Sequence, residues 1–471
     1  MGNDVKRVAI IGGGITGLTA AYYLQKESMA KGLSIEYRLI EASNELGGKV
    51  QTDYTDGFVI ERGPDSFLAR KTSAAKLAKE VGLEDELVHN DTGKSYVLNG
   101  DKLYPMPGGA IMGIPTQLTP FAATKLFSPV GKLRAAGDLV LPKTTQPDVD
   151  QSLGSFFRKR LGNEVVDRLI EPLLSGIYAG DIDKLSLMAT FPQFHQVEQK
   201  HRSLILGMKN TTPKKPKSTN PTQEKPKGMF LGLKRGLCSL VDSIENHLDE
   251  DSILKGTSVT SIVRNGEQFE LTYSDGRTES FDRVIMTTPF DVTKKALNQY
   301  SFVTDVEDIP ATSVATVAMA FPEDAIQQDI EGTGFVVSKK SDYTITACTW
   351  THRKWKHSTP EGYALLRGYV GRAGDEEIVY ESDDVIIEKV LSDLNKIMDI
   401  KGEPEFFRIT RWKNAMPQYV VGHKKKIENL TAELHSKLPG LYLAGAPYEG
   451  IGLPDCIDSG EKAVSELLSS I

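Results

Sequence analysis

The hydrophobic pattern at the start of the chain predicts two buried strands with a helix between them. Arg7 to Ile11 is a short run of apolar and β-branched residues, and Ser34 to Ile40 is a second run of this kind. The intervening residues favour a helix from about Ile15 to Lys26. Apolar strands joined through a helix are typical of a parallel sheet covered by helices. The pattern therefore predicts an α/β fold.

Two further strands of the same kind lie far downstream. The stretch SFDRVIMTTP, Ser280 to Pro289, has a polar start, a buried strand and a Thr-Thr-Pro exit. Gly440 to Leu468 contains an apolar strand, a glycine-rich loop and a terminal helix that we expect to begin near Pro454 or Asp455. Each stretch therefore predicts a further buried strand that is followed by a loop.

The middle of the chain carries two other patterns. Residues 103–141 are moderately apolar but interrupted by Pro, Gly and basic residues, and residues 152–176 have stronger helical periodicity, so we expect a small helical domain. Four later apolar runs with turns between them predict an antiparallel sheet; these runs are Val314 to Phe321, Gly334 to Val337, Tyr343 to Thr349 and Tyr363 to Val370.

Asn210 to Gly228 is rich in Lys, Pro and Thr and has no apolar period. We expect a solvated surface loop there, and a basic loop that contacts a membrane or a partner is the alternative.

Composition narrows the class of protein without identifying a reaction. The chain has 471 residues, enough for two or three domains, and its net charge of −7 argues against a general nucleic-acid binder. No secretory signal pattern and no apolar run of about 18 residues occurs, so we expect a cytoplasmic protein without a transmembrane segment. Cys238, Cys348 and Cys456 are far apart, and the eight histidines show no ligand spacing. We therefore expect free thiols and assign no metal.

A glycine fingerprint joins the first strand to its helix. Gly12, Gly14 and Gly17 have the G-x-G-x-x-G spacing. In this motif the first glycine permits a tight turn, the second a close approach to a pyrophosphate, and the third close packing of helix on strand. The helix N-terminus then offers N–H groups to the phosphates. Because the second strand ends at Glu41, an acceptor for ribose hydroxyls, the sequence predicts a dinucleotide site.

The residues after Glu41 distinguish between dinucleotides. Ala42 is followed by Leu46-Gly47-Gly48-Lys49. A second glycine pair with a basic residue after it resembles the extended FAD signature of glutathione-reductase-like and amine-oxidase-like flavoproteins, in which many members have Arg where this chain has Lys49. Residues 280–289 and 440–468 resemble the second and third cofactor segments of that class, which predicts one FAD domain built from three separate pieces of chain.

Three longer motifs resemble one family of flavoproteins. ERGPDSFLARK (Glu61 to Lys71), LIEPLLSGIYAGDIDKLSL (Leu169 to Leu187) and YEGIGLPDCIDSG (Tyr448 to Gly460) are similar to the oxygen-dependent protoporphyrinogen/coproporphyrinogen oxidases, above all to the soluble type of Gram-positive bacteria. The resemblance covers nearly the whole chain. It implies an FAD-dependent six-electron oxidation of coproporphyrinogen III, or of protoporphyrinogen IX, to the porphyrin in haem biosynthesis, with oxygen as acceptor and release of hydrogen peroxide.

The resemblance also implies a flavin amine oxidase-like architecture. We expect a discontinuous Rossmann-like FAD domain of residues 1–55, 229–292 and 431–471, an α+β substrate domain of residues 56–94, 195–228 and 293–430, and a helical domain of residues 95–194. The flavin carries the chemistry, so no catalytic side chain is assigned. The partners are the tetrapyrrole and molecular oxygen, while a peripheral membrane contact and a downstream haem-pathway enzyme stay open.

Site residues carried over from the family's motifs form two sets. The FAD contacts are Gly12, Gly13, Gly14, Ile15, Thr16, Gly17, Glu41, Ala42, Lys49, Gly63, Pro64, Asp65, Ser66, Val259, Trp412, Ile451, Gly452 and Leu453. The substrate needs an apolar slot with a cationic rim, because coproporphyrinogen carries four propionates. Lys71 is the first choice for the rim and Arg62 and Arg70 are weaker ones, while Ile177 and Tyr369 are candidate walls. Core packing is the alternative for Trp412 and Ile177.

Three rival functions use the same fold. An amine oxidase needs an aromatic cage, for which Tyr419 and Tyr448 are the candidates, whereas a carotenoid desaturase needs no basic rim. A non-catalytic prenyl-binding chaperone of GTPases has a degenerate flavin site, and here all three flavin segments are intact. The sequence leaves open the choice between coproporphyrinogen and protoporphyrinogen, the oligomeric state, the proton acceptors and the role of Cys456.

Overall fold

The computed structural model describes residues 5–91, 93–211, 228–328 and 330–471, so most of the loop expected at 210–228 lies outside the described residues. The chain packs into two compact units, each assembled from pieces that are distant in sequence. Unit 1 comprises residues 1–89, 229–309 and 425–471, and unit 2 comprises residues 90–228 and 310–424. The expected division into three functional domains stays a prediction.

Unit 1 is built on a parallel sheet, as the apolar runs predicted, and this sheet has a fifth strand, β12, that the sequence pattern did not predict. The strand order is β12-β2-β1-β16-β22, and every neighbouring pair is parallel. These strands are β1 (Lys6–Ile11), β2 (Ile35–Ile40), β12 (Ile253–Leu254), β16 (Arg283–Met286) and β22 (Leu441–Leu443). Three distant segments thus supply adjacent strands, which confirms the discontinuous sheet.

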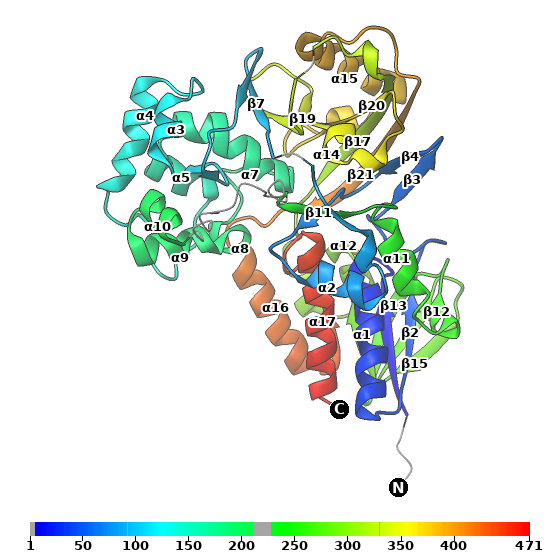
Figure 1. The fold of residues 1–471 in the computed structure, drawn as a ribbon. Helices are drawn as coiled ribbons and strands as arrows, with labels where there is room; N and C mark the ends of the chain where they lie inside the picture. The colour runs from blue at the N-terminus through cyan, green and yellow to red at the C-terminus, as the bar shows by residue number, and fades with distance from the viewer. Residues whose placement is uncertain (1–4, 92, 212–227, 329) are drawn as a thin grey trace, which may run out of the picture. The chain divides into compact units, whose positions relative to one another are not determined.

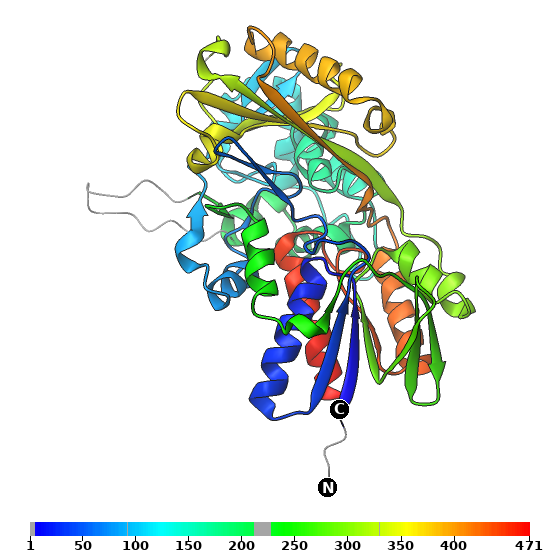
Figure 2. The ribbon, with the colours of Figure 1, turned by 90° about the vertical axis from the view of Figure 1, so that its right-hand side faces the viewer.

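Two helices cover one face of this sheet. Helices α1 (Ile15–Lys31) and α17 (Leu453–Ser469) pack side by side there (Figure 2). A Cβ on Gly460 of α17 would lie only 2.6 Å from the Thr16 carbonyl oxygen, so glycine permits this close contact. Helix α1 continues five residues beyond its expected end and stops at Gly32, whose φ is 63°.

The remaining elements of unit 1 cover the other face and the sheet edges. A second apolar core, which includes Ala9, Met286 and Leu441 of the sheet, lies between the parallel sheet and an antiparallel one. The antiparallel strands are β13 (Val259–Asn265), β14 (Gln268–Tyr273) and β15 (Thr278–Phe281), and the nearby helices are α12 (Phe290–Ala296), α13 (Ser301–Thr304) and α16 (His423–Lys437). The other short elements are β3 (Thr52–Thr55), β4 (Phe58–Glu61), β5 (Phe67–Leu68), α2 (Ser73–Glu80), β6 (Leu87–His89), β11 (Phe230–Leu233) and α11 (Cys238–Glu245).

Unit 2 is built on a seven-stranded sheet in the order β21-β17-β20-β19-β18-β7-β8. The four expected runs form the antiparallel neighbours β17 (Ala311–Pro322), β20 (Tyr363–Val370), β19 (Ile345–Trp350) and β18 (Gly334–Val337), which confirms their prediction. β21 (Phe406–Pro417), β7 (Tyr96–Asn99) and β8 (Lys102–Pro105) extend the sheet. Because β7 pairs with β18 in parallel, the sheet is mixed.

Helices surround the sheet of unit 2. Helix α15 (Asp383–Met398) covers one face through an apolar core (Figure 1). The helical region expected at residues 95–194 contains the short strands β9 (Ala110–Ile111) and β10 (Ile114–Pro115), followed by α3 (Leu118–Ala123), α4 (Pro129–Ala136), α5 (Leu153–Leu161), α6 (Asn163–Val165), α7 (Glu171–Tyr178) and α8 (Leu187–Thr190). The helices continue beyond the expected end with α9 (Pro192–His201) and α10 (Leu204–Thr211). Within the described part of the chain, no helix is both long and apolar enough to cross a bilayer.

The cysteines are free thiols, as expected. Cys348 and Cys456 are buried and Cys238 is half-buried.

Candidate functional site

The glycine loop after β1 is fixed by its neighbours and leaves the start of α1 open. Gly12 has a φ of 107°, and its N–H donates to the carbonyl of Ile40 at 2.8 Å. A Cβ on Gly17 would lie 1.9 Å from the Gly12 oxygen, so only glycine fits there. At Gly14, the N-cap of α1, an added Cβ would meet nothing within 4 Å, and no side chain caps the helix. This arrangement suits a pyrophosphate, because the positive end of the helix faces open space.

Glu41 is tied to the same loop. One carboxylate oxygen accepts the N–H of Gly13 at 2.6 Å, and the other accepts the N–H of Ser43 at 2.8 Å. The N–H of Thr257 donates to the Glu41 carbonyl at 3.0 Å, which places the chain before Val259 at the end of β2. Val259 itself is buried, so its backbone is the part suited to a ligand contact.

The second glycine pair lies against the first. The N–H of Gly47 donates to the Gly13 carbonyl at 2.8 Å, and a Cβ on Gly48 would lie 3.2 Å from the Gly14 Cα. Lys49 follows directly and places a cation beside the loop. Its side chain reaches solvent, yet desolvation by the surrounding protein lowers the pKa of Lys49 from its ordinary value.

The start of α1 lies against the loop after β22 and against α17. A Cβ on Gly445 would lie 3.2 Å from Thr16 Oγ1, and Gly452 is the N-cap of α17 without a capping side chain. The predicted contacts Ile451 and Leu453 flank this N-cap. Burial raises the pKa of the Cys456 thiol to about 11, so this side chain is neutral at physiological pH and packs rather than reacts.

Lys71, the first choice for the cationic rim, also belongs to unit 1. Its ammonium forms an ion pair with Asp455 in the first turn of α17. Both side chains line a recess of about 430 Å³, whose other lining residues are Arg70, Thr72, Ser73, Lys76, Asp458 and Glu461. Of the three cations expected at the rim, Lys71 and Arg70 thus share one recess, and Arg62 is not among its lining residues.

The predicted flavin segment 63–66 lies between β4 and β5 of unit 1 and is half-buried. The Ser66 hydroxyl donates to the Asp65 carboxylate at 2.6 Å. These neighbouring polar groups suit a ligand with several acceptors and donors, while their contact with FAD stays a prediction.

In unit 2, Tyr369 and Trp412 lie on one face of the seven-stranded sheet. Tyr369 is opposite Thr316 of β17, and Trp412 is opposite Val314, two residues away on that strand. Because side chains alternate along a strand, both rings lie on the face away from α15. Arg367 shares this face, and its guanidinium carbon is 5.1 Å from the centroid of the Tyr369 ring.

Ile177 and the two candidate cage tyrosines have different surroundings. Ile177 of α7 is 47% exposed, which excludes the core packing that was its alternative. Tyr419 is buried and stacks on His423 with ring centroids 4.2 Å apart. The buried Tyr448 hydroxyl is 3.0 Å from Thr293 Oγ1. Each tyrosine is therefore packed within its own unit.

Sequence reasoning missed two residues that fix the site. Thr287 Oγ1, at the exit of β16, lies 2.9 Å from the carbonyl oxygens of both Ile11 and Gly12, so it braces the glycine loop. Asp455 holds Lys71. The sequence signals that could have found them were the Thr-Thr-Pro exit for Thr287 and, for Asp455, an acid in the first turn of the terminal helix.

In the described ranges no group of three or more His, Cys, Asp and Glu side chains is arranged to hold a metal ion.

Known proteins with similar sequences and structures were found over the full length. The family model of flavin containing amine oxidoreductases matches residues 15–468. The coproporphyrinogen III oxidase of Bacillus subtilis (strain 168) is 55% identical over 469 residues, which cover 100% of this chain and 99% of that protein. The coproporphyrinogen III oxidase of Staphylococcus aureus (strain NCTC 8325 / PS 47) is 45% identical over 99% of this chain and 100% of that protein.

A crystal structure from Exiguobacterium sp. 255-15, described as a candidate protoporphyrinogen oxidase, matches with a TM-score of 0.88 and 40% identity over 100% of both chains. The open helix N-termini, the acid at the end of β2 and the second glycine pair fit the phosphates and ribose of FAD, which is the cofactor. The chain therefore belongs to the family of flavin-containing amine oxidoreductases.

Proposed function

We propose that the chain is an FAD-dependent coproporphyrinogen III oxidase of haem biosynthesis that uses oxygen as electron acceptor. The observation that carries this proposal is its full-length identity of 55% to a coproporphyrinogen III oxidase, and the intact dinucleotide loop supports it. In the overall reaction the porphyrinogen loses six electrons and six hydrogens, and three oxygen molecules become three molecules of hydrogen peroxide.

The residues of unit 1 bind and orient the cofactor. The first-turn N–H groups of α1, which include those of Ile15 and Thr16, hold the pyrophosphate. The Glu41 carboxylate keeps lone pairs for ribose hydroxyls beyond the two N–H groups that it already accepts. Lys49 adds a positive charge beside the phosphates. When bound, FAD supplies the hydride acceptor.

Each unit by itself offers groups that suit the substrate, cations in unit 1 and apolar surfaces in unit 2. Lys71 binds a propionate, with Arg70 in the same recess. Ile177 offers an exposed apolar surface, and Tyr369 offers a ring on the face of the unit 2 sheet that α15 does not cover. We expect Lys71→Ala to raise KM for coproporphyrinogen III while FAD content stays unchanged. Loss of FAD in this variant would contradict the assignment.

Substrate comparison tests the reaction itself. The purified holoenzyme is expected to release hydrogen peroxide with coproporphyrinogen III, more slowly with protoporphyrinogen IX, and not with polyamines. The amine oxidase alternative is less supported, because Tyr419 and Tyr448 are packed within their own units. A colourless protein that does not take up FAD would favour the prenyl-binding chaperone, and equal or inverted rates on the two porphyrinogens would overturn the substrate choice.

The enzyme is proposed to act in the cytoplasm and to touch a lipid surface through α4 and the residues after it. Val130, Leu133 and Val140 are 77%, 75% and 74% exposed, and Lys132 and Arg134 of α4 lie beside them in sequence. Exposed apolar residues among cations suit an anionic bilayer. Cosedimentation with phosphatidylglycerol vesicles that is lost in Val130→Ser/Leu133→Ser supports the contact, and no cosedimentation of the wild type contradicts it.

A further inference from the structure

The Lys71–Asp455 ion pair connects two parts of unit 1 that are far apart in the sequence. Lys71 shortly precedes α2, and Asp455 lies in the first turn of α17, three residues after the N-cap Gly452. The recess around the pair carries the cations of Arg70, Lys71 and Lys76 and the carboxylates of Asp455, Asp458 and Glu461. Lys76 pairs with Glu461 at 2.9 Å, further along α17, so the Lys71 pair is the one at the helix start.

Asp455 is fixed in place, whereas Lys71 can move. A Cβ on Gly450 would lie 2.6 Å from the Asp455 Cβ, and a Cβ on Gly452 would lie 2.7 Å from Asp455 Oδ2. The two glycines therefore make room for this carboxylate, and the helix backbone holds it. Lys71 carries its ammonium on a flexible four-carbon stem. If the pair exchanges partners, the lysine is the side chain that reorients.

The exchange requires little energy. The side chains of Lys71 and Asp455 are 36% and 28% exposed, and solvent screens an ion pair of this exposure. When Lys71 leaves, Asp455 stays next to the positive end of α17, where a carboxylate is favoured. A second carboxylate in the recess can therefore compete for the ammonium without leaving a buried charge unpaired.

We propose that Asp455 is a positioning residue that holds the Lys71 ammonium in the recess and is displaced from it by a propionate of the tetrapyrrole. This inference rests on the proposed function, in which Lys71 binds a substrate carboxylate. Lys71 keeps one carboxylate partner throughout the exchange. Asp455 thus orients the cation and, as a competitor for it, weakens the affinity for the substrate.

Kinetics of Asp455→Asn test the exchange, because this change removes the competing charge and keeps the shape. We expect KM for coproporphyrinogen III to fall about three- to fivefold, the effect of one screened ion pair, while kcat stays within about twofold. Glu449→Gln is the matched control. It breaks the exposed ion pair between Glu449 and Lys462 of α17, which lies outside the recess, and it should leave KM unchanged.

A double-mutant cycle with Lys71→Ala shows whether the effect of Asp455→Asn on KM depends on Lys71 or comes from a structural change elsewhere. In that background, Asp455→Asn should no longer lower KM. An unchanged or raised KM in the single variant, the same fall in Glu449→Gln, or a fall that persists without Lys71 would overturn the proposal.

Equilibrium binding distinguishes a failed exchange from a failed function. Coproporphyrin III, titrated into each holoenzyme by fluorescence quenching, should bind more tightly to Asp455→Asn than to the wild type. If the wild type does not oxidise coproporphyrinogen III, the proposed function is wrong, and this titration still decides the exchange. Equal dissociation constants for the two proteins would overturn it.

Discussion

The carboxylate of Glu41, at the end of β2, accepts the backbone N–H of Gly13 in the loop after β1 at 2.6 Å. Its second oxygen accepts the N–H of Ser43 at 2.8 Å. The acid at the end of β2 therefore fixes the loop after β1, and we propose a second role in which its remaining lone pairs accept ribose hydroxyls of FAD.

Glu41→Ala is expected to remove both roles together. Hydrogen bonds to a charged group contribute about 1.5–3 kcal/mol, so FAD affinity should fall at least about tenfold. Glu41→Gln keeps an acceptor oxygen, so its FAD affinity should fall less than that of Glu41→Ala. Titration of the deflavinated protein with FAD measures both, and an Ala variant that binds as tightly as the wild type would show that Glu41 does not contact the cofactor.

Gly14 and Gly17 should respond differently to alanine. At Gly14 the backbone has a φ of −69° and an added Cβ meets nothing, so Gly14→Ala should keep the unfolding temperature of the deflavinated protein but lose FAD, because the methyl group enters the pyrophosphate site. At Gly17 the Cβ would lie 1.9 Å from a carbonyl oxygen, and Gly17→Ala should cost about 1–3 kcal/mol of stability. Thermal unfolding measures the stability of each variant, and flavin absorbance measures its FAD content. Equal behaviour of the two variants would contradict this assignment of the glycines.

FAD affinity should depend on pH through Lys49. Because desolvation lowers the pKa of Lys49 from 10.5, the side chain loses its charge at a lower pH than a free lysine does. Affinity for the anionic cofactor should therefore fall as the pH rises through this lowered pKa. Lys49→Arg stays charged, so its FAD affinity should not fall over this pH range, and Lys49→Met should bind FAD weakly at every pH. A wild type whose FAD affinity matches that of Lys49→Met below this pKa would refute the role.

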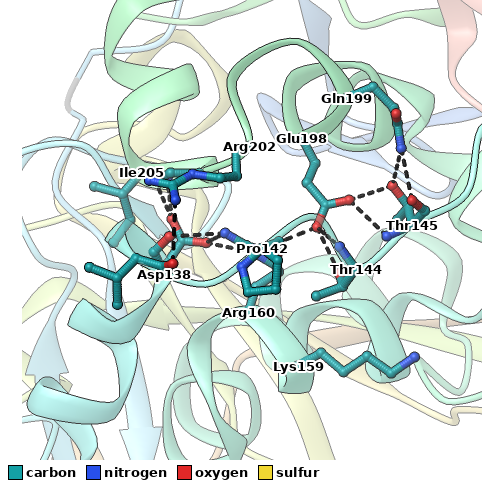
Figure 3. A network of polar contacts seen from close by, with 12 residues as sticks. Asp138, Pro142, Thr144, Thr145, Lys159, Arg160, Glu198, Gln199, Arg202 and Ile205 are labelled. Carbon is teal, nitrogen blue, oxygen red and sulfur yellow. Dashed lines mark hydrogen bonds and ion pairs between the residues drawn. The ribbon is translucent and has the colours of Figure 1, made fainter.

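Arg160 is the centre of a buried polar network in unit 2 (Figure 3). Its guanidinium lies 2.6 Å from Asp138 and 3.4 Å from Glu198, and all three side chains are fully buried. Glu198 also accepts the N–H and hydroxyl groups of Thr144 and Thr145, which ties the chain after η2 (Gly137–Leu139) to α5 and α9.

Arg160→Met leaves two carboxylates without their cation, so the free energy of unfolding should fall by about 3–5 kcal/mol. Lys159→Met, at the exposed neighbouring position, is the control and should change it little. Urea unfolding measures both. If the two variants are equally stable, the network is not a stabilising element.

His352 should make stability depend on pH in the acid range. Desolvation lowers its pKa from 6.5, and the ring Nδ1 is 3.2 Å from the Leu365 carbonyl. As the pH falls below 6.5, the unfolded chain binds the proton before the folded one does, so stability declines until the lowered folded-state pKa is reached. His352→Gln should flatten this part of the curve of unfolding temperature against pH. An unchanged curve would show that His352 does not contribute.

The sequence by itself determined the elements whose signals are local. Apolar runs predicted β1, β18 and β20 almost to the residue, and the spacing of Gly12, Gly14 and Gly17 predicted the turn between β1 and α1, where Gly12 and Gly17 leave no room for a Cβ. These signals lie within a few residues of the structure they specify, because backbone sterics and side-chain periodicity act over that range.

The motifs predicted that residues 280–289 and 440–468 join the first segment, but only the tertiary structure decided which strands and side chains meet elsewhere. β7 pairs in parallel with β18, and Lys71 meets Asp455 across 384 positions of sequence. Neither Lys71 nor Asp455 carries a local signal for its partner, since a charged residue near a helix start is equally suited to solvent. The packing of α17 on α1, and of the chain before α2 on α17, brings the two charges together, because burial of apolar surface selects among the long-range arrangements that local patterns allow.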